Sequence, residues 1–252
     1  PLQDQKGKIQ GAVAVMRDVT SLRHLEQMRQ EFVSNVSHEL RTPLTSIKGF
    51  VETLLNGHLE DKQLLERFLN IIAAETDRMI ALINDLLDLS RVESGKLKIN
   101  RAAVDMKKVF DDTVLLLQSR AEEKRIELTN NIYDPVIVEG DEKLLRQVAL
   151  NLVDNGVKYT PEGGRVWIEA EQGLDYVEFI VADTGVGIAS EHLDRIFERF
   201  YRVDKGRSRH TGGTGLGLAI VKHIIDRHKG TIAVESRVGK GTRIRITLKR
   251  AN

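Results

Sequence analysis

Two long stretches in the first hundred residues carry apolar side chains at helical spacing. In residues 21–55 these side chains recur every three or four positions, as on one face of a helix. The recurring positions are Leu22, Leu25, Phe32, Val36, Ile47, Val51, Leu54 and Leu55. Turn formers end both patterns, Asn56-Gly57 after the first and Ser94-Gly95 after the second. This part of the chain is therefore predicted to be a hairpin of two long helices.

The second stretch, from Asp61 to Val92, has an apolar stripe too wide for one partner helix to cover. Its members are Leu64, Leu65, Phe68, Leu69, Ile71, Ile72, Met79, Ile80, Leu82, Ile83, Leu86, Leu87 and Leu89. Pairing two such hairpins as a four-helix bundle would bury the excess apolar surface. We therefore predict a two-fold homodimer through residues 21–93. A partner segment from the same chain is the alternative, although the rest of the chain has a different pattern.

Residues 106–252 alternate between the helical period and the period of two that is typical of strands. Helices are expected at Met106–Glu123, at Asp141–Val157 with Asp141 as the cap, and at Gly215–His228. Strands are expected at Ile126–Ile132, Pro135–Val138, Arg165–Glu171, Tyr176–Ala182, Thr231–Ser236 and Thr242–Leu248. This order predicts an α/β sandwich with helices on one side of a mixed sheet.

Three segments connect or precede these regions. Residues 95–105 are interpreted as a short polar linker with a hinge at Gly95. Residues 189–214 form a long, charged, glycine-bearing stretch, and loops of that length are usually lids or binding loops. In residues 1–20, the sequence predicts a turn at Lys6-Gly7-Lys8, a strand from Ile9 to Val19 and a helix N-cap at Asp18-Val19-Thr20. This piece resembles the last strand and exit motif of a PAS sensor domain, and a plain N-terminal arm is the alternative.

Composition and charge narrow the function classes. The chain has 252 residues and a net charge of +1, which gives no reason to expect nucleic acid or an anionic membrane as a partner. It has no cysteine, so a disulfide framework, a thiolate zinc site and a catalytic thiol are all excluded. No apolar run approaches the ~18 residues of a membrane span. Because the chain begins with Pro1 and shows no signal peptide, we expect a fragment of a longer protein.

A polar turn in the first predicted helix is the leading candidate for chemistry. Ser34, His38, Thr42 and Thr45 share one helical face. Pro43 leaves the carbonyl of Glu39 without its helical donor, which predicts a bend just after His38. Such a turn is a plausible way to present an imidazole to solvent, and a surface histidine on an amphipathic helix is the alternative.

Three polar clusters occur in the second half. One helical face carries Asn151, Asn155, Lys158 and Tyr159. Mg²⁺ bound to phosphates would satisfy the amide oxygens of the asparagines, and the phosphate charge would pair with the Lys158 ammonium. An exposed polar face is the alternative there.

The second cluster, Asp183-Thr-Gly185-Val-Gly187, follows a strand. Its carboxylate can accept from an exocyclic amine such as that of adenine, although an ordinary turn has the same pattern. The third, Gly212-Gly213-Thr214-Gly215-Leu216-Gly217, opens a helix and makes an anion cradle, but it matches neither the P-loop nor the dinucleotide signature.

The order of these motifs is similar to that of two-component sensor histidine kinases. The matching segments are a phosphoacceptor box at His38, an asparagine box at Asn151–Tyr159, a glycine box at Asp183–Gly187, an aromatic box at Phe197–Arg202 and a second glycine box at Gly213–Gly217. The resemblance covers residues 21–252. It implies an all-α hairpin that forms a dimeric four-helix bundle, followed by an α/β sandwich of the Bergerat (GHKL) ATP-binding type. One departure is Gly156, where the family more often has alanine.

The resemblance also implies roles for single residues. Asp183 would contact the adenine amine, Asn155 would coordinate Mg²⁺, and Arg202 would meet the γ-phosphate of ATP. Asn151, Lys158 and Tyr159 would line the nucleotide and its phosphates, and the backbone of Gly213, Gly215 and Gly217 would close over the phosphates. His38 would take the phosphoryl group with Glu39 as the proton acceptor, and then pass it to an aspartate of a response regulator. Thr42 would position water for the reverse, phosphatase reaction.

Two other functional classes are alternatives. An ATPase of the same fold that acts as a conformational clamp lacks a helix like that of His38. A non-catalytic dimeric scaffold would not need Asn155, Asp183 and the glycines intact. The family resemblance further implies the cytoplasmic kinase core of a bacterial inner-membrane receptor, without direct membrane contact in residues 1–252.

Overall fold

The structure is a computed structural model that describes residues 2–3, 9–11, 18–57, 61–93, 99–203 and 213–251. The chain divides into two compact units, Pro1–Thr42 and Pro43–Asn252. In the first unit, strands β1 (Leu2–Gln3) and β2 (Ile9–Gly11) pair antiparallel. The predicted turn at residues 6–8 lies outside the described residues.

Helix α1 (Thr20–Asn56) begins at the predicted cap. The Asp18 carboxylate accepts a hydrogen bond from the Thr20 N–H at 2.8 Å, which confirms the N-cap. The helix ends at Asn56, immediately before Gly57, as predicted. It continues through Pro43, so the proline does not end it, and the expected bend near His38 stays a prediction.

Helix α2 (Lys62–Glu93) follows after a short connection. The Asp61 carboxylate accepts from the N–H groups of Gln63 and Leu64 and caps its start. The rings of Phe50 on α1 and Phe68 on α2 lie 5.1 Å apart between centroids. Several apolar side chains on α2 remain exposed, namely Leu69, Ile80, Ile83 and Leu87. The wide stripe expected from the sequence is thus left partly uncovered within one chain.

The remainder of the second unit is an α/β domain with a five-stranded mixed sheet. The strand order is β4 (Glu127–Asn130), β6 (Arg165–Gln172), β7 (Tyr176–Asp183), β9 (Gly241–Lys249) and β8 (Thr231–Arg237). β4 pairs parallel with β6, and the other neighbours pair antiparallel. A separate two-stranded sheet joins β3 (Ala102–Asp105) to β5 (Ile137–Gly140).

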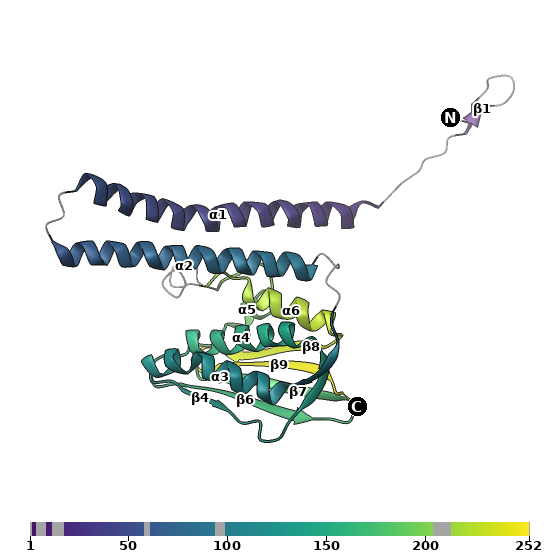
Figure 1. The fold of residues 1–252 in the computed structure, drawn as a ribbon. Helices are drawn as coiled ribbons and strands as arrows, with labels where there is room; N and C mark the ends of the chain where they lie inside the picture. The colour runs from purple at the N-terminus through teal and green to yellow at the C-terminus, as the bar shows by residue number, and fades with distance from the viewer. Residues whose placement is uncertain are drawn as a thin grey trace. The chain divides into compact units, whose positions relative to one another are not determined.

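Three long helices lie on one face of the five-stranded sheet (Figure 1). They are α3 (Met106–Glu123), α4 (Glu142–Tyr159) and α6 (Gly217–Arg227). The core between helices and sheet is fully buried and includes Phe110 of α3 and Phe179 of β7, whose rings lie 5.8 Å apart between centroids. Caps fix the helix starts, because Asp105 accepts from the Lys107 N–H and Asp141 from the Lys143 and Leu144 N–H groups. The predicted α/β sandwich and the cap at Asp141 are confirmed.

The structure corrects parts of the predicted segmentation. Residues 95–105 are not linker throughout, because Ala102–Asp105 form strand β3 and Val104 is buried against the domain. The stretch 189–214 contains a short helix, α5 (Ser190–Leu193). Helix α6 begins at Gly217 rather than Gly215, because Gly215 has a φ of 73°, outside the helical region. Among the described residues, no helix is long and apolar enough to cross a bilayer.

A buried histidine ties the end of α6 to the start of α4. The Nε2 atom of His228 accepts from the Asp141 N–H at 3.0 Å, and its Nδ1–H donates to the Ile224 carbonyl at 2.8 Å. Both bonds require the neutral ring. Burial is the main cause that lowers the pKa of His228. The hydrogen bond to the Ile224 carbonyl partly opposes this shift.

This geometry predicts a loss of stability in mild acid. The unfolded state takes up a proton near pH ~6.5 while the folded ring stays neutral, so the His228 contribution is present above that pH and falls below it by at most ~1.4 kcal/mol per pH unit. Urea unfolding at pH 7.5 and 5.5 should show a smaller pH effect in His228→Asn than in the parent. His223→Gln is the control, and an equal pH effect in all three proteins would contradict the assignment.

Candidate functional site

The last two turns of α4 present the asparagine cluster. Asn151, Asn155 and Lys158 are half-buried, while Leu152, Val153 and Val157 on the opposite side are buried in the core. The Asn155 amide has no hydrogen-bond partner among the described residues. The buried apolar side of α4 thus holds its polar face in place. The side-chain amide of Asn155 on that face is available to a ligand.

Asp183, at the end of β7, has one carboxylate oxygen committed and one open. Its Oδ1 accepts from the N–H groups of Gly185 at 2.7 Å and Thr242 at 3.2 Å. Its Oδ2 has no partner in the described part of the chain. Burial raises the pKa of Asp183, and the two backbone bonds oppose that shift. The arrangement fixes the carboxylate and leaves one acceptor oxygen for the recognition of an amine.

The loop after Asp183 packs tightly against the end of α4. The Val186 N–H donates to the Tyr159 carbonyl at 3.2 Å. A methyl group on Gly185 would lie 2.7 Å from that carbonyl oxygen, so this position needs glycine. Gly187 has a φ of 69°, and a methyl group there would lie 2.1 Å from the carbonyl oxygen of Arg237. Asp183 and the asparagine helix are therefore held as one rigid site.

The second glycine box approaches the same helix. A methyl group on Gly213 would lie 2.8 Å from Lys158 Nζ and 3.4 Å from the Tyr159 hydroxyl. A methyl group on Gly217 would lie 3.2 Å from Asn151 Oδ1. The structure thus brings together the three clusters that are separated in sequence.

The conformation of this glycine box depends on two anchors. Gly215 adopts a φ of 73°, its carbonyl accepts from the Phe200 N–H at 2.9 Å, and Leu216 is fully buried. Helix α6 begins immediately afterwards, so its first N–H groups have no helical partners. Glycines beside such a helix start suit an anion.

The electrostatics of the cradle also favour an anion. The pKa of Lys158 is lowered to about 8, mainly by burial; Asp154 opposes this, and Arg202, Arg120 and Arg78 lower it further. Several cations therefore act on one half-buried ammonium. A bound phosphate would relieve their repulsion and restore the charge on Lys158.

Lys124 supports this site and was not expected from the sequence. Its Nζ donates to the carbonyls of Val157, Lys158 and Thr160 at 2.7, 3.0 and 2.8 Å, which satisfies the carboxyl end of α4. Burial is the main cause that lowers the pKa of Lys124. Lys124 precedes Arg125, which has a φ of 52°, and no glycine in the sequence marks that turn.

Lys124→Met should destabilise the domain by ~1–3 kcal/mol, because three partly buried carbonyls lose their donor. Urea unfolding of the parent and the variant measures the change. Lys143→Met, at an exposed position at the other end of α4, is the matched control. Equal stability of the two variants would show that the Lys124 bonds contribute nothing.

The phosphoacceptor residues lie in the first unit, Pro1–Thr42. His38 is exposed on α1, as expected. The Thr42 hydroxyl donates to the His38 carbonyl at 3.2 Å, and Glu39 is half-buried. The turn therefore leaves the His38 imidazole accessible to a reacting group.

The donor set fits a magnesium ion held together with phosphates. No group of three or more His, Cys, Asp or Glu side chains that could hold a metal occurs among the described residues. Mg²⁺ usually takes one or two protein oxygens and completes its shell with waters and substrate phosphates. The amide oxygen of Asn155 is a suitable single ligand of that kind.

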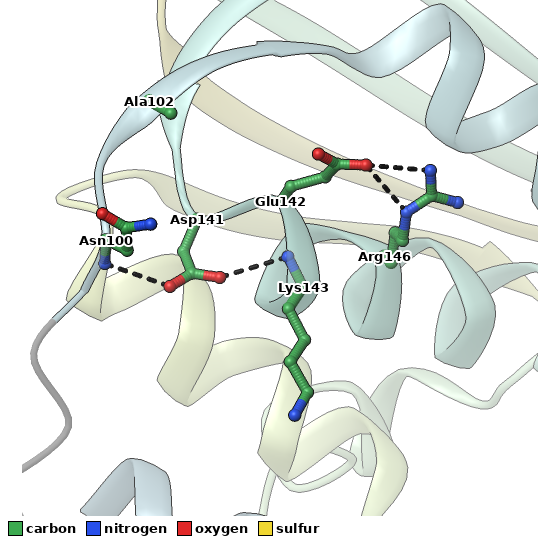
Figure 2. A pocket seen from close by; sticks show the side chains of 6 residues that line it. All are labelled: Asn100, Ala102, Asp141, Glu142, Lys143 and Arg146. Carbon is green, nitrogen blue, oxygen red and sulfur yellow. Dashed lines mark hydrogen bonds and ion pairs between the residues drawn. The ribbon is translucent and has the colours of Figure 1, made fainter.

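A shallow pocket of about 390 Å³ lies elsewhere, at the start of α4 (Figure 2). It is lined by Asn100, Ala102, Asp141, Glu142, Lys143 and Arg146. Arg146 binds Glu142 and Asp112, and Asp141 accepts from the Asn100 N–H. The pocket lies at the opposite end of α4 from Asn155 and Lys158, and it belongs to the helix cap rather than to the site.

Comparisons with known proteins match both regions. Residues 28–95 match the family described as His Kinase A (phospho-acceptor) domain. Residues 140–252 match the family described as histidine kinase-, DNA gyrase B- and HSP90-like ATPase. The sensor histidine kinase WalK of Bacillus subtilis (strain 168) is 42% identical over 252 residues, which cover 98% of this chain and 41% of WalK. The chain thus spans about two fifths of the length of that relative.

Solved structures show the same likeness. A mycobacterial sensor histidine kinase, MprB, is 33% identical with a TM-score of 0.52, and the match covers 60% of this chain and 97% of MprB. The histidine kinase ThkA, in a crystal structure with the response regulator protein TrrA, is 26% identical with a TM-score of 0.72. That match covers 93% of this chain and 68% of ThkA.

Proposed function

Because the chain belongs to the sensor histidine kinases, we propose that it transfers the γ-phosphoryl group of ATP to His38 and then to an aspartate of a response regulator. The observation that carries this proposal is that Asp183, Asn155, Lys158 and the glycine box lie at one site. There the Asn155 amide and the Asp183 Oδ2 atom have no partner among the described residues. The exposed His38 on a separate helix supplies the acceptor.

The proposed nucleotide seat follows from the contacts. The open Oδ2 of Asp183 accepts from the adenine amine, and Gly185 and Gly187 let the backbone approach the base. Asn155 would hold Mg²⁺, which would offset phosphate charge. Lys158, Asn151 and Tyr159 line the phosphates, Arg202 meets the γ-phosphate, and the backbone of the loop made of Gly213, Thr214, Gly215, Leu216 and Gly217 closes over them.

The transfer step uses groups of this chain. The unprotonated ring nitrogen of a neutral His38 forms a bond to the γ-phosphorus, the bond to the bridging oxygen breaks, and ADP leaves with that electron pair. The proton on the other ring nitrogen passes to Glu39, which acts as the general base. Lys158 and Arg202 stabilise the charge that develops on the transferred group.

Thr42 is proposed to serve the opposite reaction. After the phosphoryl group has moved to the regulator, the Thr42 hydroxyl would position water for its hydrolysis. In the structure this hydroxyl donates to the His38 carbonyl, and it can accept from water at the same time. Kinase and phosphatase activities therefore share one turn of α1.

Incubation of the chain with Mg²⁺ and ATP labelled at the γ-phosphorus tests the proposal. A phosphoramidate is labile in acid and stable in base, so the bound label should be lost in acid and kept in alkali. ATP labelled at the α-phosphorus should give no bound label. A label stable to acid would indicate a serine or threonine ester and would contradict the proposal.

A homodimer through residues 21–93 is proposed from the exposed apolar side chains of α2. Their burial in a second copy contributes roughly 25 cal/mol for each Å² removed from water. Sedimentation of the chain at micromolar concentration should therefore give the mass of two copies. A monomer under those conditions would contradict the bundle.

The proposed setting is the cytoplasmic kinase core of a membrane receptor in bacteria, with residues 1–20 as the end of a PAS-like sensor. The conformational-clamp ATPase is not favoured, because the phosphoacceptor family matches residues 28–95. A non-catalytic scaffold is not favoured either, because Asn155 and Asp183 keep their ligand-facing groups.

A further inference from the structure

Helix α2 reaches the glycine box through one carboxylate. Asp85 Oδ2 accepts from the Thr214 hydroxyl at 2.6 Å, and the Thr214 hydroxyl oxygen accepts from the Leu216 N–H at 3.2 Å. Helices α2 and α6 also contact each other. A side chain of the helical hairpin is thereby joined to the loop that is proposed to close over the phosphates.

Asp85 lies on a face of α2 that is turned to the α/β domain. Arg78, Leu82, Asp85 and Leu89 follow one another at spacings of four, three and four, which places them on one helical face. Leu82 and Leu89 are buried, and the charge of Arg78 acts on Lys158. The carboxylate thus lies within a contact surface rather than on open helix.

A second polar contact provides a comparison. Asp88 Oδ2 accepts from Gln147 Nε2 of α4 at 2.7 Å. This bond holds the same two parts together but does not involve the glycine box. Variants of Asp85 and Asp88 can therefore separate the effect of α2 contacting the α/β domain from the effect of a carboxylate at the phosphate cradle.

Asp85 uses the partners that phosphates would use. Burial raises the pKa of the Asp85 carboxyl, while the Thr214 bond and the charge of Lys158 lower it. Lys158 also lies beside Gly213, in the cradle itself. A half-buried carboxylate is costly unless it is paired, and here it accepts from the Thr214 hydroxyl and is favoured by the charge of Lys158, two groups of the proposed anion site.

We propose that Asp85 is an internal competitor of the nucleotide phosphates, so that the α2 contact at the glycine box and a bound triphosphate oppose each other. The inference rests on the proposed ATP site. By linkage, ATP weakens the α2 contact by the same factor by which the contact weakens ATP binding. The contact therefore acts as an autoinhibitory latch that ATP and the hairpin control reciprocally.

Calorimetric titration of the full chain with adenosine, ADP and ATP, with Mg²⁺ present, tests this proposal. Asp85→Asn keeps the size and an acceptor for Thr214 but removes the negative charge. It should tighten ATP binding by ~5- to 10-fold, ADP binding by less, and adenosine binding not at all. Asp88→Asn, the matched control, should change all three by less than ~2-fold.

The outcomes separate this proposal from the proposed function. An unchanged ATP affinity in Asp85→Asn, or an equal gain for adenosine, would overturn the competition while the ATP site stands. An equal gain in Asp88→Asn would assign the effect to docking alone and would also overturn it. A parent chain that binds none of the three ligands would overturn the ATP site and the inference together.

Discussion

Asp183→Asn is expected to weaken ATP binding by ~10- to 100-fold and to leave the domain folded. The asparagine side chain can still accept from the Gly185 and Thr242 N–H groups through its oxygen, as Oδ1 of Asp183 does. Its NH₂ group then occupies the place of Oδ2 and points a donor at the adenine amine. The loss of a charged acceptor, together with two donors that face each other, should cost ~1.5–3 kcal/mol of binding free energy.

The same substitution should alter base preference, which a simple loss of stability would not do. Guanine carries an oxygen where adenine carries the amine, so the asparagine NH₂ can donate to it. Calorimetric titration with ATP and GTP should show a smaller ATP preference in Asp183→Asn. Asp175→Asn, immediately before the opposite end of β7, is the matched control. An unchanged ratio of ATP to GTP affinity would contradict the placement of the base.

His38→Gln should lower the bound γ-phosphoryl label at least ~100-fold, to background, because glutamine has no nucleophilic ring nitrogen. His38 is exposed, so the substitution should not disturb α1. His223→Gln on α6 is the matched control and should label as the parent does. Nucleotide affinity in His38→Gln should equal that of the parent, because the residue lies outside the nucleotide site. Equal labelling of His38→Gln and the parent would contradict the assigned acceptor.

Local signals in the sequence predicted the elements with strong caps. Helix α3 runs over Met106–Glu123 as expected, because a long amphipathic pattern begins directly after the Asp105 cap. The Asp141 cap and the helix stop at Asn56 were predicted for the same reason. Cap chemistry depends on residues within one turn, so the local sequence contains it.

Pairing between distant segments could not be predicted in the same way. Strand β3 was taken for linker because it contains a single large apolar residue, Val104, and it is a strand only through its pairing with β5. The parallel pairing of β4 with β6 depends on the three-dimensional crossover between them. Neither of these pairings has a local sequence pattern that would identify it.

The same difference between local and long-range information applies to the candidate site. The glycines and the asparagine face were expected, because their residue types carry the chemistry. Lys124 and Asp85 were missed, because a lone lysine or aspartate on a helix is usually a solvated charge. The bond from Thr214 to Asp85 joins residues 129 positions apart, and only the folded chain reveals it.

Locating the transferred phosphoryl group on the chain tests whether His38 is the acceptor. The parent protein, labelled with Mg²⁺ and γ-labelled ATP, should be digested at alkaline pH and its peptides sequenced by mass spectrometry. We expect a phosphohistidine at His38 in the peptide that also contains Glu39. A phosphoryl group on another residue, with His38 unmodified, would contradict it.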